Sequence, residues 1–306
     1  METNYDVIII GGGAAGMAAA LWCDDLKLTA LLIEREAKLG GQLLRVYNPI
    51  KNHLGTQAEN GLDLRDIFVK QIEDHQFSVR LQSEIVGVDW ENKSVTLGSG
   101  ETFSAGAIII AAGIRRRRLN VEGEIEFTEK GIIESGKRDA HLVENKNVCI
   151  VGGGDAAFEN ALIVAGTAAS VMLVQRRENF RARSEFIEQV ENNPKVEILT
   201  ETAVKKITGG KRVEAIEFEN LKTGKIFARN VEAILIRIGV EPNTDFLRGQ
   251  LDLDENGYIK INQSCETNVK DIYAVGDVAN PIAPTVSSAV GMGATAVKAI
   301  SFRLKN

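Results

Sequence analysis

Short, strongly apolar runs recur along the chain, and their length is typical of strands buried in the centre of a sheet. These runs cover residues 5–10, 30–33, 107–110, 148–151, 171–174, 233–238 and 272–275. Several of them end directly at a glycine, which predicts a turn at the point where the apolar run stops. The pattern therefore predicts a protein organised around buried central strands.

Weaker patterns lie between these runs. Shorter strands are predicted over residues 78–81, 85–90, 94–97, 195–199, 212–219 and 226–228, with turns between them. Helices are predicted from Met17 onward, over 63–74, where apolar residues recur at near-helical spacing, and over 286–304. The stretch from 115 to 144 is polar and has no strong periodicity.

Two glycine patterns each follow a predicted strand and open a predicted helix. The first is Gly11-x-Gly13-x-x-Gly16, and the second is Gly152-x-Gly154-x-x-Ala157. The glycines let the backbone turn sharply and approach a pyrophosphate, which then rests on the N-terminus of the helix. One such pattern is weak evidence, but two in this context predict two Rossmann-like dinucleotide-binding domains.

The charges after the second strand of each unit differ. Strand 30–33 ends on Glu34, whose carboxylate can accept hydrogen bonds from ribose hydroxyls and would repel a 2′-phosphate. Strand 171–174 ends on Gln175, Arg176 and Arg177, and paired guanidinium groups would hold a 2′-phosphate. The sequence thus predicts FAD in the first unit and NADPH in the second, a pairing that indicates electron transfer.

The order of segments predicts that the second unit is inserted into the first. Two linkers, near 113–118 and 238–244, would join them, and two crossings make a hinge geometrically natural. The expected boundaries are 1–114 and 241–306 for the FAD domain and 118–237 for the NADPH domain.

Composition narrows the function classes. The 306 residues suffice for about two domains, and 44% hydrophobic with 25% charged residues is ordinary for a globular protein. A net charge of −6 gives no basic footprint for nucleic acid. No apolar run approaches the length of a membrane span, and the first strand begins too early to leave room for a signal peptide, so we expect a cytoplasmic protein.

The three cysteines are widely separated, and none belongs to a CxxC. Cys23 and Cys149 lie in apolar segments and are interpreted as small buried hydrophobic residues. Cys265 lies in a predicted loop, where a buried role and a reactive role both stay open. No metal site is expected.

The order of motifs resembles the low-molecular-weight thioredoxin reductases and related flavoproteins with two dinucleotide-binding domains. The shared motifs span nearly the whole chain: Gly11–Gly16, Glu34, Gly40–Gln42, Asn52, Ala111–Gly113, Gly152–Ala157, Arg176, Arg177, Arg181, 238–244 and 273–277. The resemblance implies an α/β fold with two Rossmann-like domains of the three-layer ββα type, the NADPH domain inserted into the FAD domain. It also implies a homodimer.

The resemblance implies a set of FAD contacts. Asp277 would accept hydrogen bonds from the ribityl chain, unless it is only a turn residue. The last helix would begin beneath the isoalloxazine, where its N-terminus stabilises negative charge on the reduced ring. The amides of Gln42 and Asn52 would bind near the flavin, unless they are only loop amides. The expected contacts are Gly11, Gly13, Ala14, Ala15, Gly16, Glu34, Gln42, Tyr47, Asn52, Val86, Ala112, Gly113, Gly276, Asp277, Pro284, Thr285 and Val286.

The resemblance also implies a set of NADPH contacts in the inserted domain. Its expected NADPH contacts are Gly152, Gly154, Asp155, Ala156, Ala157, Arg176, Arg177 and Arg181. The three arginines would clamp the 2′-phosphate, with help from Arg183, although a run of arginines is more often a solvated surface. Gln175 stands where the family has histidine, and we expect this exchange to matter little.

The dithiol of thioredoxin reductases is missing. Its CxxC would fall on Ser135-Gly136-Lys137-Arg138, so Ser135 and Arg138 occupy the two cysteine positions. Asp139 stands where the family has an aspartate thought to manage protons, and without a dithiol we interpret it as a surface carboxylate. Exchange through an internal dithiol is thus unavailable, and we do not expect the chain to reduce thioredoxin.

The electron acceptor stays open among three alternatives. The chain resembles ferredoxin/flavodoxin–NADP reductases on the same scaffold in Gly40-Gly41-Gln42 followed by Tyr47. Arg115–Arg118 could dock a small acidic electron carrier, unless the run is only an exposed linker or a contact to a cofactor phosphate. Those enzymes usually carry a C-terminal extension over the flavin, whereas this chain stops after its last helix.

In the second alternative, the reduced flavin passes its electrons to a small acceptor such as a quinone, a metabolite or oxygen. The third possibility is a non-catalytic or redox-sensing protein, in one variant with a second flavin in the inserted domain, against which the arginines argue. On the enzymatic alternatives NADPH delivers hydride to flavin N5, a step that requires no protein acid or base.

Overall fold

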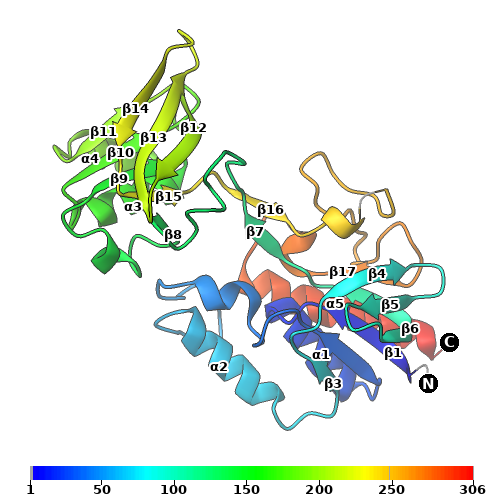
Figure 1. Ribbon diagram of the computed structural model, residues 1–306. Coiled ribbons are helices and arrows are strands. Elements are labelled where there is room, and N and C mark those ends of the chain that lie inside the picture. Colours follow the sequence, from blue (N-terminus) through cyan, green and yellow to red (C-terminus); the bar gives the residue numbers. More distant parts are fainter. Residues whose placement is uncertain (1–2, 248, 306) are drawn as a thin grey trace. The chain divides into compact units, whose positions relative to one another are not determined.

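The chain folds into two compact α/β units (Figure 1). The computed structural model describes residues 3–247 and 249–305. Unit 1 comprises the chain up to Arg115 and from Glu241 onward, and unit 2 comprises Arg116–Val240. The inserted arrangement of two Rossmann-like domains is therefore confirmed, and the expected boundaries lie close to this division.

Unit 1 is built on a parallel sheet in the order β3-β2-β1-β6-β17. These strands are β1 (Thr3–Ile10), β2 (Ala30–Ile33), β3 (Ser78–Arg80), β6 (Thr102–Ile110) and β17 (Ile272–Ala274). An antiparallel extension, β4 (Ile85–Asp89) and β5 (Ser94–Leu97), pairs with the first part of β6. The helices are α1 (Ala14–Asp25), α2 (Gly61–Ile72) and α5 (Val286–Leu304).

The alternation of apolar side chains along β1 explains the layers of unit 1. Val7 and Ile9 pack into the cluster that contains residues of all three helices. Ile8 and Ile10 pack into a second cluster on the other face, with Val95 of β5. Successive side chains of a strand point to opposite faces, so one sheet separates a helical layer from an antiparallel β layer.

Unit 2 repeats this plan with a parallel sheet in the order β11-β10-β9-β15-β8. Its strands are β8 (Ile132–Ile133), β9 (Asn147–Val151), β10 (Ser170–Val174), β11 (Val196–Leu199) and β15 (Ala233–Ile236). The other face carries an antiparallel sheet of β12 (Thr202–Gly209), β13 (Val213–Asn220) and β14 (Ile226–Asn230). The helices are α3 (Asp155–Ala165) and α4 (Ser184–Glu191).

The core of unit 2 divides between the two faces in the same way. Val148 and Ile150 pack with α3, whereas Cys149 and Val151 pack with the antiparallel sheet. Both units therefore have the three-layer ββα arrangement that the sequence predicts.

The two crossovers pair with each other. They form strands β7 (Ile114–Arg116) and β16 (Val240–Pro242), which make a separate two-stranded sheet. Short 3₁₀ turns complete the architecture: η1 (Gly41–Arg45), η2 (Ala140–Leu142), η3 (Asp245–Leu247) and η4 (Gly276–Val278). No helix among the described residues is long and apolar enough to cross a membrane.

Strand β12 and helix α4 were not predicted from the sequence, and neither were the short strands β7, β8 and β16. Strand β12 carries adjacent lysines that weaken its alternation, and α4 has only eight residues, too few for a periodic signal. The helix predicted over 63–74 begins earlier, at Gly61, because the Asn60 side chain accepts the Asp63 N–H and caps it. The central strands lie where the apolar runs place them.

Candidate functional site

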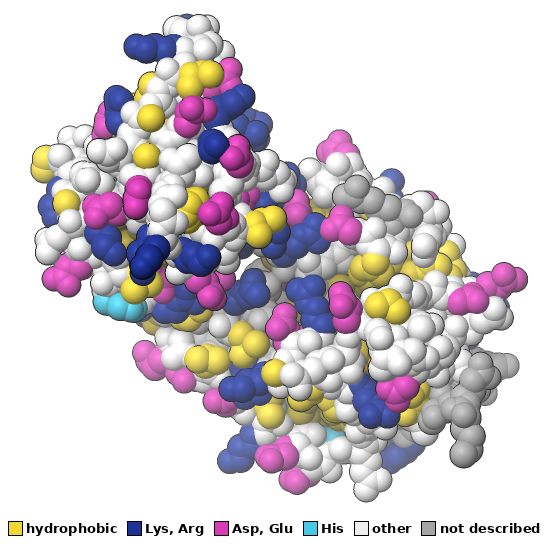
Figure 2. Space-filling model, viewed as in Figure 1, with side chains coloured by type: hydrophobic (Ala, Val, Ile, Leu, Met, Phe, Trp, Pro, Cys, Tyr) yellow, Lys and Arg dark blue, Asp and Glu magenta, His cyan; other side chains and the backbone are white. Residues whose placement is uncertain are grey.

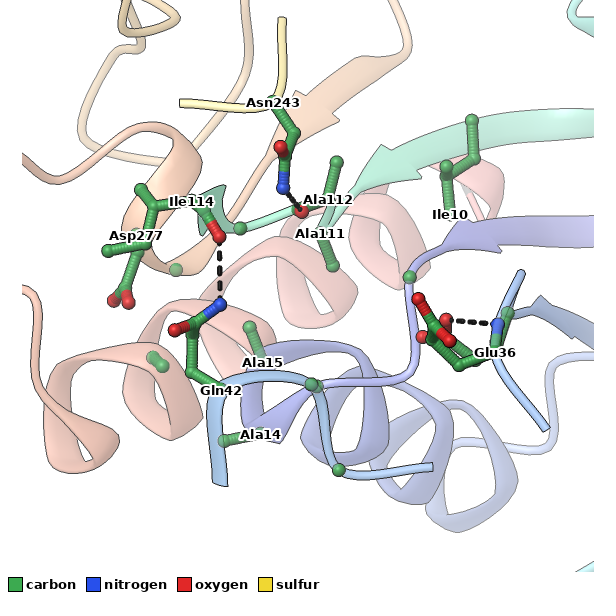
Figure 3. Close-up of a pocket in the computed structure, with 18 of the residues that line it drawn as sticks. Ile10, Ala14, Ala15, Glu36, Gln42, Ala111, Ala112, Ile114, Asn243 and Asp277 are labelled. Atoms are coloured by element: carbon green, nitrogen blue, oxygen red, sulfur yellow. Dashed lines mark hydrogen bonds between the residues drawn. The ribbon is translucent and has the colours of Figure 1, made fainter. Parts of the chain in front are cut away.

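A cavity of about 550 Å³ opens in unit 1 at the ends of the central strands (Figure 3). Ligands of open α/β sheets bind at this carboxyl edge. Most of the expected FAD residues line the cavity: Gly11, Gly13, Ala14, Ala15, Glu34, Gln42, Ala112, Gly113, Gly276, Asp277, Pro284, Thr285 and Val286. The structure thus brings together residues that the sequence spreads from position 11 to position 286.

The glycines of the first turn have two different roles: two of them allow close packing, and one leaves free space. Gly11 has φ of +107°, and a Cβ there would lie 2.4 Å from the Ala111 carbonyl oxygen. A Cβ on Gly16 would lie 1.9 Å from the Gly11 oxygen. By contrast, a Cβ on Gly13 would meet no atom closer than 3.9 Å. Gly11 and Gly16 let α1 approach the sheet, whereas Gly13 leaves the room in which a pyrophosphate would approach the backbone.

Glu34 is held at the end of β2 with only 7% of its surface exposed. One carboxylate oxygen accepts the Gly12 N–H at 2.7 Å, and the other accepts the Glu36 N–H at 2.9 Å. Two backbone donors thus fix the orientation of a negative charge that lines the cavity. This charge fits the ribose hydroxyls of FAD and excludes a 2′-phosphate.

Asp277 and Gln42 bring polar atoms to the same cavity (Figure 3). Burial raises the pKa of Asp277, and none of the described residues forms a hydrogen bond with its carboxylate. Gln42 Nε2 donates to the Ile114 carbonyl oxygen at 2.8 Å. The hydroxyl groups of a ribityl chain would supply the partners that Asp277 lacks, so the residues present fit FAD.

The N-terminus of α5 also faces the cavity, since Pro284, Thr285 and Val286 all line it. Thr285 caps the helix through its hydroxyl, which accepts the Ser288 N–H at 3.3 Å. The positive end of this helix dipole therefore faces the cavity, where it would favour negative charge on a bound group.

Four expected FAD residues do not line the cavity: Gly16, Tyr47, Asn52 and Val86. Gly16 acts through packing. Asn52 is exposed, and Val86 is 63% exposed while its neighbour Ile85 lines the cavity, since successive strand side chains face opposite sides. Direct contacts from these residues stay predictions.

Sequence reasoning missed a polar network on the cavity wall. Arg115 pairs with Glu241 at 2.9 Å and with Asp245 at 2.5 Å, and Asn243 Nδ2 donates to the Ala112 oxygen at 2.7 Å. Phe246 lines the cavity beside them. Asn243 stands in a motif that was noticed but given no role. Arg115 was interpreted as part of an arginine run that docks a carrier, forms an exposed linker or contacts a cofactor phosphate, and its ion pairs were not predicted.

The second glycine turn, in unit 2, has the same geometry. Gly152 has φ of +149°, and a Cβ there would lie 2.2 Å from the Arg237 carbonyl oxygen. A Cβ on Gly154 would meet nothing within 4 Å. The next residue, Asp155, begins α3 and pairs with Arg183 at 3.0 Å, so Arg183 is engaged in an ion pair.

The expected NADPH arginines lie on the loop that follows β10. Arg176, Arg177 and Arg181 are exposed, and none pairs with a carboxylate of the described residues. The buried Gln175 donates through Nε2 to the Arg177 oxygen at 2.8 Å, and the Arg181 N–H donates to the Gly153 oxygen at 2.8 Å. Gln175 therefore fixes the loop that presents the arginines, a structural role that the sequence did not assign.

Comparison with known proteins agrees with this geometry. Residues 5–293 match the family described as pyridine nucleotide-disulphide oxidoreductase. The chain belongs to this family. It is 35% identical over 297 residues to a thioredoxin reductase of Spironucleus barkhanus, with 95% of each chain covered.

Solved structures agree as well. The thioredoxin reductase of Lactococcus lactis matches with a TM-score of 0.84 and 29% identity, over 99% of this chain and 100% of that one. A bacillithiol disulfide reductase of Bacillus cereus matches at 0.81 with 19% identity, over 98% of this chain and 100% of that one, which shows the shared fold alone. The expected cofactors, FAD and NADPH, are those that the thioredoxin reductase family uses.

The turn at which the resemblance places the family's dithiol corrects one interpretation. Asp139 is not a surface carboxylate, since only 4% of its surface is exposed. It accepts the main-chain N–H groups of Glu134 at 2.9 Å and Ser135 at 3.1 Å, and it pairs with the Arg138 guanidinium at 2.5 Å. Burial alone would raise the pKa of Asp139, but these donors outweigh it and lower that pKa. Arg138 thus neutralises the carboxylate beside it.

All three cysteines are buried. Burial raises the pKa of the Cys23 thiol to about 12 and that of Cys265 to about 11, and it also raises the pKa of Cys149. The buried interpretation of Cys23 and Cys149 is confirmed, and the structure favours it for Cys265 too. Across residues 3–247 and 249–305 no group of His, Cys, Asp or Glu could hold a metal ion.

The open position at Gly13 gives a direct test of the FAD site. We expect Gly13→Ala to weaken FAD retention at least tenfold, about 1.4 kcal/mol, because its methyl group would occupy the space of the pyrophosphate. The measurement is FAD content by absorbance, together with the unfolding midpoint of the flavin-free protein, which should not fall. Gly291→Ala, at an exposed position with nothing within 4 Å of its Cβ, is the matched control. Equal FAD retention in both variants would contradict the assignment.

The ion pair of Asp139 predicts a pH dependence. The folded-state pKa of this carboxyl lies below its unfolded value, so its contribution to stability is complete above about pH 4 and is lost as the pH falls through the folded pKa. We expect Asp139→Asn to lower the free energy of unfolding by roughly 1.5–3 kcal/mol at pH 7, with a smaller difference below pH 4. Denaturant unfolding of both proteins from pH 3 to pH 8 measures this. Asp74→Asn, at an exposed turn residue after α2, is the comparison variant.

Proposed function

We propose that this chain is an FAD-containing, NADPH-dependent oxidoreductase that passes electrons to an acceptor outside the chain. The proposal is supported by the turn Ser135–Arg138, where the resemblance places the family's dithiol and the sequence has no cysteine, and by Asp139, which Arg138 holds as an ion. No cysteine lies near that turn in the sequence. A disulfide relay inside this chain therefore has no thiols to use at that position.

The preference for NADPH over NADH rests on charge. The glycine turn of unit 1 is followed by the buried Glu34, and that of unit 2 by the exposed Arg176 and Arg177. A 2′-phosphate carries about two negative charges, and guanidinium groups bind phosphate through paired charge-assisted hydrogen bonds. A second flavin in unit 2 would leave these guanidinium groups without that partner.

The residues of unit 1 would bind and orient the flavin rather than exchange protons with it. FAD, when bound, supplies the capacity to accept a hydride from NADPH. Glu34 and the turn at Gly13 would hold its adenosine and pyrophosphate, and Asp277 its ribityl chain. The N-terminus of α5 would stabilise the charge of the reduced ring without a proton transfer.

A small-molecule acceptor is favoured over a docked acidic protein. Of the run Arg115–Arg118, Arg115 is paired with Glu241 and Asp245, and Arg117 Nε donates to the Val240 oxygen at 2.9 Å. On the face of each unit that Figure 2 shows, Lys and Arg side chains are interspersed with Asp and Glu. Steering of an acidic carrier needs a more uniform positive field. The homodimer expected from the resemblance stays a prediction.

Anaerobic titration of the purified flavoprotein tests the electron source. We expect NADPH to bleach the flavin absorbance far faster than NADH. Arg176→Ala with Arg177→Ala should raise the KM for NADPH by roughly tenfold to a hundredfold and leave that for NADH nearly unchanged, because each charge-assisted contact is worth about 1.5–3 kcal/mol. Arg229→Ala, on the exposed β14, is the control. Failure of both nucleotides to bleach the flavin would refute the proposed function.

Reoxidation of the reduced protein tests the electron acceptor. We expect fast reoxidation by a quinone or by oxygen and no turnover with thioredoxin, because the Ser135–Arg138 turn has no thiol. Ferredoxin and flavodoxin are the competing acceptors. If either supported fast turnover that high salt or Arg117→Ala with Arg118→Ala abolished, the carrier alternative would replace the small acceptor.

A further inference from the structure

Three arginines converge at the carboxyl edge of the unit 2 sheet, outside the loop expected to hold the 2′-phosphate. Arg116 Nη1 donates to the Glu134 carbonyl oxygen at 2.6 Å, and Arg237 Nη2 donates to the same oxygen. Arg138 pairs with the side chain of Glu134 at 3.2 Å. Two guanidinium groups that share one acceptor oxygen lie close together, and their like charges repel.

Arg237 carries a charge that no carboxylate of the described residues neutralises. Its Nη1 donates to the Ile236 oxygen at 2.9 Å and its Nη2 to Glu134, and both acceptors are backbone carbonyls. The side chain is partly buried. The acidic groups nearby are otherwise engaged, because Asp139 and Glu134 pair with Arg138, and Asp155 pairs with Arg183. Arg237 therefore retains a positive charge that no carboxylate of the described residues balances.

Two further observations place this charge at a ligand-binding edge. The Arg237 carbonyl oxygen is the atom that a Cβ on Gly152 would strike, so Arg237 lies directly beside the second glycine turn. The hydroxyl of the buried Ser135 accepts the Arg138 N–H at 3.2 Å, and its own proton has no acceptor among the described residues. Both features lie at the ends of parallel strands, where open α/β sheets bind ligands.

We propose that Arg237, together with Arg116 and the Ser135 hydroxyl, forms an anion site that binds a phosphate or carboxylate group. An anion between the two guanidinium groups would remove their mutual repulsion and accept the free Ser135 proton. The site stands where the family's dithiol would lie, so charge recognition replaces thiol chemistry at this edge. The anion has two possible sources: the pyrophosphate of the pyridine nucleotide, or an acidic small-molecule acceptor. The first source rests on the proposed function.

Inorganic pyrophosphate, titrated calorimetrically into the oxidised flavoprotein, is the probe. The experiment uses the Arg176→Ala, Arg177→Ala background, so that the 2′-phosphate loop does not bind it. We expect Arg237→Met to weaken pyrophosphate binding at least tenfold, whereas Arg229→Met, an equal loss of charge on the exposed β14, leaves it unchanged. Arg237→Lys, which keeps the charge, should restore part of the binding.

Competition then distinguishes the two sources. If NAD⁺ displaces pyrophosphate, and Arg237→Met weakens NAD⁺ and NADP⁺ binding by similar factors, the site holds the pyrophosphate of the nucleotide. If pyrophosphate binds equally well at saturating NAD⁺, the site takes a separate acidic molecule. Equal binding by the parent, Arg237→Met and Arg229→Met proteins would overturn the proposal. No step of the titration transfers electrons, so its failure is distinct from a failure of NADPH to bleach the flavin.

Discussion

The close approach of a glycine to a neighbouring strand end determines the shape of both candidate nucleotide sites. In unit 1 this contact joins Gly11 to the Ala111 carbonyl at the end of β6, and in unit 2 it joins Gly152 to the Arg237 carbonyl after β15. The two glycines have positive φ, and any Cβ would collide with a backbone oxygen that cannot move without breaking the sheet. Each turn is therefore held at the carboxyl edge of its sheet. Two positions later, at Gly13 and Gly154, the backbone has free space beside it. The rest of each site is arranged around that fixed edge.

The third position of each pattern shows how far this constraint extends. Gly16 tolerates no side chain, because its Cβ would lie 1.9 Å from the Gly11 oxygen. Unit 2 has the fully buried Ala157 at the corresponding place, and a Cβ on Gly152 would lie 3.1 Å from its methyl group. Helix α3 thus leaves room for one methyl group between itself and the second glycine turn. The backbone plan is shared, and the chemical difference between the units comes from the side chains after the second strand.

The sequence predicted the positions of helices and strands that depend on a local pattern. It did not predict which charged side chains are buried or paired, because that depends on residues brought together by the fold. Strand 30–33 and helix 286–304 were placed to the residue, because an apolar run and a capped helix are local signals. Asp139 was interpreted as exposed, because nothing in the sequence shows that Arg138 and two backbone N–H groups surround it. Arg115 was read as part of a surface run, although its partners lie more than a hundred residues away in the chain. Charge type could be read from the sequence, but charge pairing could not.

The turn Ser135–Arg138, where the resemblance places the family's dithiol, determines the chemistry available at this edge of unit 2. A dithiol there needs a carboxylate that can take up and release a proton, and a lowered pKa makes Asp139 unsuited to that task. Arg138, which the resemblance places at a cysteine position of the family, supplies the cation that holds Asp139 ionised. With Asp139 neutralised by Arg138, Arg237 has no carboxylate partner among the described residues, and its Nη2 donates to the same Glu134 carbonyl oxygen as Arg116. On the function that we propose, the residue that stands in place of a thiol is therefore also the one that neutralises Asp139.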